Sequence, residues 1–111
     1  FMEEFLVSDL AKMAYVKNAA MLDDNGFIIA AQPEDKETKN MLAKLAEIHY
    51  ISDEFQQTSI VTETLILIIN RLTGGNILIV GCDSKSNLGQ VRQEIDSAVS
   101  RLDSYLQSKQ R

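Results

Sequence analysis

The sequence has few of the residues that cross-link, kink or interrupt a chain: among 111 residues it has one cysteine, one proline and no tryptophan. The single thiol, Cys82, excludes an internal disulfide and is typical of a protein from a reducing compartment. No linker-like stretch is present, so we expect one domain over residues 2–108. Met2 is the expected native start, with Phe1 an added residue.

Long apolar runs and positive charge are also scarce. The longest apolar run, residues 65–69, is far shorter than the roughly 20 residues that a membrane helix needs. Eleven Lys and Arg against 16 Asp and Glu give a net charge of −5, which disfavours binding to nucleic acid or to an anionic membrane. No secretory leader is recognisable before the first polar residues. We therefore expect a cytoplasmic protein without membrane insertion and without a nucleic-acid partner.

Hydrophobic periodicity in the first half of the chain predicts a helix, a hairpin and a second helix. Residues 3–15 place their apolar side chains at helical spacing. In residues 16–32, the Asn25-Gly26 step supplies the positive φ angles of a tight turn between two strands. Pro33 and the two acids that follow it are typical of the start of a second helix.

The second half is rich in Val, Ile and Thr and predicts three strands followed by a long helix. We expect the strands over residues 58–63, 65–72 and 76–82, with a turn at Gly74-Gly75. The last helix begins at Asn87, so the predicted order is α-β-β-α-β-β-β-α. Hairpin-linked strands flanked by helices indicate an α+β fold, in which helices cover the faces of an antiparallel sheet.

The stretch Ser-Asn-Leu-Gly-Gln at residues 86–90 is the first candidate for a phosphate-binding loop. A Walker loop needs two glycines spaced by four residues and then Lys with Ser or Thr, but here one glycine stands alone and no Lys follows it. Asn87 is placed as a helix N-cap, and Gln90 completes a capping-box pattern. We interpret the stretch as a helix start, in which Gly89 allows the first turn to approach a neighbouring strand.

The other candidates for chemistry are isolated. His49 is the only histidine, and no zinc-like spacing surrounds it, so we interpret it as a residue on a helix face. Cys82 is interpreted as a packed thiol, with a nucleophile as the alternative. Adjacent acid pairs do not converge as a catalytic acid and base must. We therefore expect no active site, no metal and no cofactor.

With these residues interpreted, the sequence resembles the roadblock/dynein light-chain domain family, in particular its bacterial and archaeal branch. Residues 16–31, "VKNAAMLDDNGFIIAA", are similar to the opening hairpin of the family. Residues 74–95, "GGNILIVGCDSKSNLGQVRQEI", are similar to its strand, Asn-Leu-Gly step and following helix. The order of elements also agrees, and the resemblance covers about residues 5–106.

The resemblance implies one five-stranded antiparallel sheet, with the second helix on one face and the first and last helices on the other, in layers like those of profilin. It implies a protein without enzymatic activity that dimerises through its second helix and third strand. The partners that it implies are small Ras-like GTPases in polarity and gliding systems, or dynein and membrane-signalling complexes.

The residues themselves favour such a dimer at one point. The predicted second helix has a wider apolar stripe than one sheet face requires, and the strand "TSIVT" would be an exposed edge. A second copy could cover both; the alternative is that a loop covers the stripe. The predicted interface comprises Met41, Leu42, Leu45, Ile48, His49, Ile60 and Thr62, and the predicted polar rim comprises Lys36, Lys39, Lys44 and Glu47.

The leading hypothesis is therefore a dimeric platform, a homodimer or a heterodimer with a paralogue, that regulates a small Ras-like GTPase as an activator or a scaffold. Arg71, near a turn, is a weak candidate for an arginine finger, and a solvated turn residue is the alternative. A second hypothesis is a structural light chain without nucleotide sensing. A third is a small-molecule sensor, which the scarcity of aromatic and convergent polar residues disfavours.

Overall fold

The computed structural model describes residues 2–51 and 57–109, and the side chains of all of these except residues 43 and 45–51. Three helices and five strands follow the predicted order α-β-β-α-β-β-β-α, with a short 3-10 turn, η1, before the last strand. The elements are α1 (Met2–Ala11), β1 (Val16–Leu22), β2 (Ile28–Gln32), α2 (Lys36–Ile51), β3 (Gln57–Val61), β4 (Leu65–Arg71), η1 (Thr73–Gly75), β5 (Ile77–Asp83) and α3 (Leu88–Lys109).

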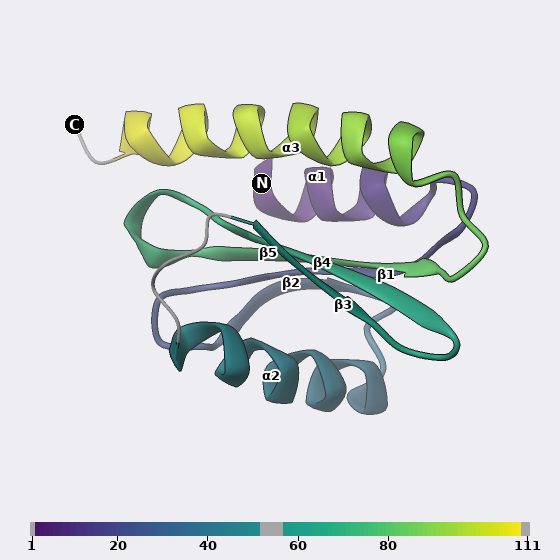
Figure 1. Ribbon diagram of the computed structural model, residues 1–111. Helices are drawn as coiled ribbons and strands as arrows, with labels where there is room; N and C mark the ends of the chain where they lie inside the picture. The colour runs from purple at the N-terminus through teal and green to yellow at the C-terminus, as the bar shows by residue number, and fades with distance from the viewer. Residues whose placement is uncertain (1, 52–56, 110–111) are drawn as a thin grey trace.

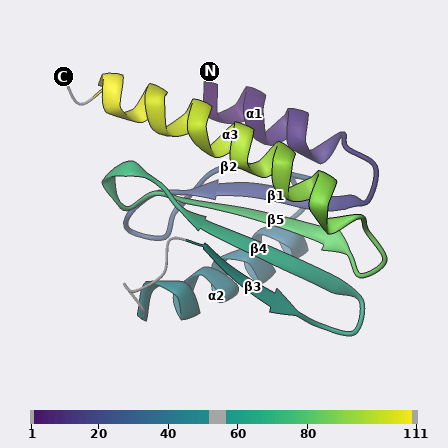
Figure 2. The same ribbon diagram turned by 45° about the horizontal axis from the view of Figure 1, so that its top comes forward.

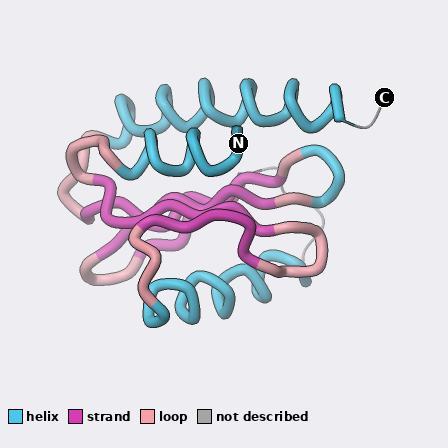
Figure 3. Tube along the Cα trace, turned by 180° about the vertical axis from the view of Figure 1, so that it is seen from behind, coloured by secondary structure: helices cyan, strands magenta, loops and turns pink. Residues whose placement is uncertain are grey.

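The five strands form one antiparallel sheet in the order β2-β1-β5-β4-β3. Helices α1 and α3 lie side by side on one face, and α2 lies alone on the other (Figure 1). In the oblique view, α1 and α3 lie on the near side of the sheet and α2 lies behind it (Figure 2). The view from behind shows the three layers (Figure 3). The predicted α+β class and the sheet sandwiched by helices are confirmed.

Each face of the sheet has its own hydrophobic core. The larger core lies under α1 and α3, where Leu6 and Val7 of α1 and Ile95 and Leu102 of α3 are buried against the sheet. The smaller core lies under α2 and contains Leu42 of that helix. The sheet supplies both cores because successive residues of a strand point to opposite faces. Nearly continuous Ile, Leu and Val in β4 and β5 reflect burial on both sides.

The start of α3 confirms the interpretation of residues 86–90 as a helix start. The N–H of Gln90 donates to Oδ1 of Asn87 at 3.3 Å, which is the capping contact that the pattern predicts. The role expected for Gly89 was wrong. Among the described residues, a Cβ at Gly89 would meet only Oδ1 of Asn87, at an ordinary 3.5 Å, so no described strand approaches this glycine closely.

The third and fourth strands end earlier than predicted, and the fifth is shifted by one residue. Strand β3 ends at Val61, because residues 62–64 form a tight turn closed by a 2.8 Å hydrogen bond from the N–H of Thr62 to the carbonyl of Leu65. The predicted turn at Gly74 and Gly75 is present as the 3-10 turn η1, in which both glycines have positive φ angles of 77° and 82°. Among the helices described, none is both long enough and apolar enough to cross a membrane.

Candidate partner-binding surface

Strand β3 is an edge of the sheet, since it stands last in the strand order and pairs with β4. Ile60 points to the α2 face, where it packs partly buried against the smaller core. The next residue, Val61, is 72% exposed. An exposed edge with β-branched side chains is a template for pairing with another strand. The edge is therefore the first candidate for a contact with another chain.

Two hydrogen bonds from Arg92 hold this edge strand to α3. Arg92 of α3 donates from Nη1 to Oε1 of Gln57 at 2.6 Å and from Nη2 to Oγ of Ser59 at 3.0 Å. Nε2 of Gln57 in turn donates to Oδ1 of the buried Asn70 on β4 at 2.8 Å. The side of β3 under α3 thus carries two hydrogen-bonded polar residues and the exposed Val61, whereas its other side presents Ile60. No local sequence pattern indicates this role of Arg92, because its two partners lie on a strand more than 30 residues earlier in the chain.

The first half of α2 has a partly exposed face on the same side of the sheet as Ile60. A shallow hollow of about 610 Å³ lies there, lined by Lys36, Glu37, Asn40, Met41 and Lys44. Met41 is its apolar member and also packs against the smaller core, whereas the two lysines are exposed. Lys39, predicted for the same rim, is partly buried. An apolar floor within charged side chains is typical of a protein-binding surface.

Of the residues predicted for the interface, one is buried and another lies in a turn. Leu42 is fully buried in the smaller core, so it supports α2 from beneath and does not lie on the surface. Thr62 lies in the turn after β3, where its Oγ1 accepts a 2.9 Å hydrogen bond from the N–H of Leu65. The remaining predicted residues lie on α2, but their side chains are outside the described part: Leu45, Glu47, Ile48 and His49.

Asp35 fixes where α2 begins. Its Oδ1 accepts a 2.7 Å hydrogen bond from the N–H of Thr38, as an N-cap carboxylate does. This bond lowers the pKa of the Asp35 carboxyl below its ordinary value, so the group stays charged beside the positive end of the helix dipole. The cap sets the start of the helix and hence the positions of Lys36 and Met41 on its face. The predicted helix start after Pro33 is confirmed.

The other candidates for chemistry, Cys82 and Arg71, lie on strands β5 and β4. Cys82 is fully buried, and its burial raises the pKa of the thiol, so it remains protonated and is not an activated nucleophile. Among the described side chains, no three of His, Cys, Asp and Glu come together as metal ligands. Arg71 lies partly buried at the end of β4. The features that distinguish this molecule are an open strand edge and a helix face.

The fold has well-matched relatives among solved structures, although no protein-family model and no curated protein matches the sequence. The Roadblock/LC7 domain from Streptomyces avermitilis superimposes with a TM-score of 0.76 at 17% identity, covering 94% of this chain and 97% of that chain. Myxococcus xanthus MglB gives 0.76 at 22%, covering 95% and 94%. The gliding protein MglB from Thermus thermophilus gives 0.75 at 16%, covering 92% and 86%.

These superpositions extend over nearly the whole of each chain, and so they include all three layers. Identities of 22% or less carry the fold and say nothing of shared partners. The chain has the fold of the Roadblock/LC7 domain proteins, as the resemblance of its sequence led us to expect.

Proposed function

We propose that the protein is a non-enzymatic dimeric platform that binds and regulates a small Ras-like GTPase, as its resemblance to the roadblock/dynein light-chain domains implies. The observation that carries the proposal is the edge strand β3, whose Ile60 points to the face of the sheet that α2 covers. The partly exposed face of α2 lies on that same face of the sheet. Residues 2–108 act as one domain in this proposal. The free thiol of Cys82 favours a reducing compartment, such as the cytoplasm.

In the proposed dimer, β3 pairs with β3 of a second copy across a two-fold axis. Such a contact is isologous, so one surface serves both copies and the assembly closes. It joins two five-stranded sheets and removes the exposed edge with Val61. It also brings the two α2 helices together. The residues proposed for this interface are those predicted from the sequence apart from the buried Leu42, together with the exposed Val61: Met41, Leu45, Ile48, His49, Ile60, Val61 and Thr62.

The paired α2 helices form the proposed GTPase-binding surface. Their polar rim would comprise Lys36, Lys39, Lys44 and Glu47, of which the first and third are exposed. Because Arg71 is partly buried rather than held on a protruding loop, we propose that the platform acts by repositioning residues of the GTPase itself. A heterodimer with a paralogue would present an equivalent surface.

The dimer is tested by light scattering over a micromolar concentration series. The wild-type chain should have about twice the 12.4 kDa mass of the monomer. Val61→Lys should yield monomers, because it places a charge at the paired edge. Phe27→Lys is the matched control, since Phe27 is 70% exposed and lies in the turn between β1 and β2. A wild-type monomer, or two variants with the same mass, would refute dimerisation through β3.

The GTPase is tested by capture of a Ras-like GTPase from the same organism on the immobilised protein. A regulator should bind the forms loaded with GDP and with a non-hydrolysable GTP analogue with different affinities, and Lys36→Glu with Lys44→Glu should weaken the tighter one. Equal binding in both nucleotide states would favour the structural light chain instead. Absence of binding in both states would overturn the GTPase proposal while leaving the dimer intact.

A further inference from the structure

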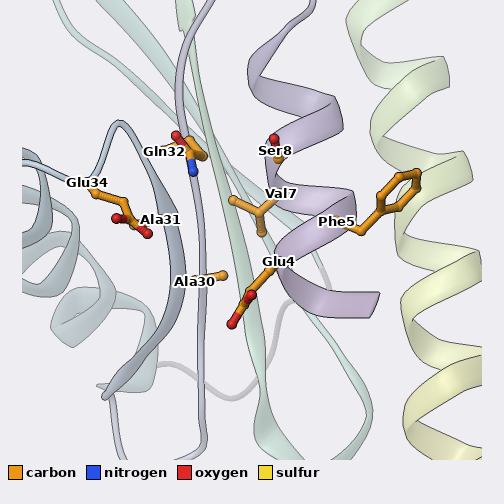
Figure 4. A pocket seen from close by; sticks show the side chains of 8 residues that line it. All are labelled: Glu4, Phe5, Val7, Ser8, Ala30, Ala31, Gln32 and Glu34. Atoms are coloured by element: carbon orange, nitrogen blue, oxygen red, sulfur yellow. The ribbon is translucent and has the colours of Figure 1, made fainter. Parts of the chain in front are cut away.

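A hollow of about 360 Å³ lies between α1 and the edge strand β2, where Glu4 and Val7 face Ala30 (Figure 4). Ala30 and Ala31 of this strand are only 8% and 3% exposed, so the backbone of the β2 edge is covered. The connection from α1 to β1 differs, because it holds an exposed aromatic side chain on a strained backbone: Tyr15 is 54% exposed. This connection therefore offers a contact surface that the β2 edge does not.

Tyr15 stands at a position that suits glycine. The N–H of Val16 donates to the carbonyl of Met13 at 3.2 Å, so Tyr15 is the third residue of a four-residue turn. Its φ angle is 75°, which at this position of a turn normally selects Gly or Asn. A bulky L residue in this conformation is an outlier. Such strain collects at functional sites, and an exposed ring recovers little of its cost by burial.

Asp83 fixes this turn from the neighbouring strand β5. Its N–H donates to the carbonyl of Tyr15 at 2.8 Å, and its Oδ2 lies 4.0 Å from Nζ of Lys17. Lys17 is the extra residue of a β-bulge, at which the pairing of β1 with β5 shifts by one residue. Oδ1 of Asp83 accepts a 2.9 Å hydrogen bond from the N–H of the exposed Lys85. We call Tyr15, Lys17 and Lys85, which are joined through Asp83, the Tyr15 patch.

The charge at the patch is positive although the chain is acidic. The two chain segments that meet here, residues 12–17 and 83–87, contain three lysines and one acid. That acid, Asp83, is already engaged by Lys17 and by the N–H of Lys85. Both segments lie at the same end of the sheet (Figure 1). With a net charge of −5, the chain would repel an extended anionic surface such as a membrane, whereas a short acidic segment need contact only these lysines.

We propose that the Tyr15 patch binds a short acidic segment of a partner protein. Carboxylates of the segment pair with Lys17 and Lys85, and an aromatic side chain of the segment lies against the ring of Tyr15. The turn holds the ring in place before binding, so little conformational entropy is lost there. The patch includes no residue of α2 or β3, so the inference does not rest on the proposed dimer or GTPase.

The probe is a fluorescein-labelled peptide, Asp-Asp-Phe-Glu-Glu, titrated with the full chain and followed by fluorescence anisotropy. Two control peptides separate the interactions: Asn-Asn-Phe-Gln-Gln removes the charge, and Asp-Asp-Ala-Glu-Glu removes the ring. We expect each control to bind about three- to tenfold more weakly, since an aromatic pair and exposed ion pairs each contribute modestly. Sedimentation with vesicles that contain about 30% phosphatidylserine tests the membrane as the alternative occupant.

Tyr15→Gly separates binding from folding. It removes the ring and relieves the positive φ, so the peptide should bind about three- to tenfold more weakly while the unfolding temperature stays the same or rises. Phe27→Ala is the matched control, since it removes another exposed ring, from the turn between β1 and β2, and should leave the affinity unchanged.

The lysines are tested in the same way. Lys17→Gln with Lys85→Gln should weaken the peptide about two- to tenfold, since exposed ion pairs contribute modestly. The matched control, Lys36→Gln with Lys44→Gln, removes two exposed lysines from α2 and should leave the affinity unchanged.

Three outcomes would overturn the proposal: no binding of the probe peptide up to about 1 mM, equal binding of the uncharged peptide, or full affinity in Tyr15→Gly. Binding to the vesicles without binding to the peptide would also overturn it if substitution of Lys17 and Lys85 abolishes that binding, because the patch would then bind a membrane.

Discussion

Arg92, in the second turn of α3, donates from Nη1 to Oε1 of Gln57 at 2.6 Å and so reaches a residue that stands 35 positions earlier in the sequence. The same guanidinium donates a second hydrogen bond, from Nη2 to Oγ of Ser59. Strand β3 lies at the edge of the sheet and has one neighbouring strand. Its position therefore depends also on side-chain hydrogen bonds to α3. The helix thereby holds the edge that we propose as the dimer interface.

We expect Arg92→Ala to lower the free energy of unfolding by about 1–2 kcal/mol, because it removes a part-buried hydrogen bond to Gln57 and an exposed one to Ser59. Urea denaturation measures this loss. Amide exchange in β3 should accelerate more than in β5. Arg101→Ala is the matched control, since Arg101 is exposed on the same helix. If both variants lower the free energy of unfolding equally, the hydrogen bonds from Arg92 do not stabilise β3.

Gly81 of β5 leaves room for the side chain of Asn18, its partner residue on β1. A Cβ at Gly81 would overlap Oδ1 of Asn18 and lie 2.8 Å from its Cγ. Asn18 is only 5% exposed and has little space to move. Gly81→Ala should therefore destabilise the fold by about 1–3 kcal/mol, as overpacking of a core does. Thermal or urea unfolding of the variant gives this value.

The cause is tested by combining Gly81→Ala with Asn18→Ala, which removes the overlapping atoms. The double variant should recover most of the lost stability, because the buried Oδ1 of Asn18 has no hydrogen-bond partner among the described residues. Gly89→Ala is the contrasting control: its Cβ has room, and alanine in a helix should stabilise by up to about 1 kcal/mol. Without recovery in the double variant, the overlap with Asn18 is not the cause.

Burial raises the pKa of Cys82 above its ordinary value of about 8.5. Below about pH 8 the thiol is protonated both folded and unfolded, so it does not make stability depend on pH. As the pH rises from the unfolded pKa towards the folded pKa, the unfolded chain releases this proton first, and the free energy of unfolding falls. Urea denaturation from about pH 7 to pH 10 should show this fall in the wild type and less of it in Cys82→Ala.

A difference in stability between wild type and Cys82→Ala that stays constant over this range would contradict the assignment. Reaction with a thiol reagent gives an independent measurement. The folded protein should react far more slowly than the protein in urea, because the thiolate is the reactive form and the folded chain suppresses it.

The order of elements and the sheet were predictable because each local signal agreed with the final fold. Asn25-Gly26 forms the turn between β1 and β2, Gly74-Gly75 forms the turn between β4 and β5, and Asn87 caps α3. Periodicity also found the apolar stripe of α2. The periodicity does not indicate which residues of the stripe face the sheet. Leu42 was therefore predicted to lie at the interface, although it is buried.

What the sequence could not predict depends on residues that are far apart. The contact between Arg92 and Gln57 joins two elements that no local pattern relates. The close approach expected at Gly89 occurs instead at Gly81, whose neighbour across the sheet, Asn18, is distant in the chain. The hollow between α1 and β2 likewise required the docking of α1 beside Ala30 and Ala31, which the amphipathic pattern of α1 alone does not specify.

The placement of α1 and α3 on one face has a practical consequence for handling the molecule. The two described ends of the chain, at Met2 and Lys109, belong to these two helices, and α2 lies across the sheet from both (Figure 1). A tether attached at either end therefore holds the molecule by the face away from α2. When it is immobilised in this way on a sensor, its α2 face points into the solution, where an injected protein can reach it.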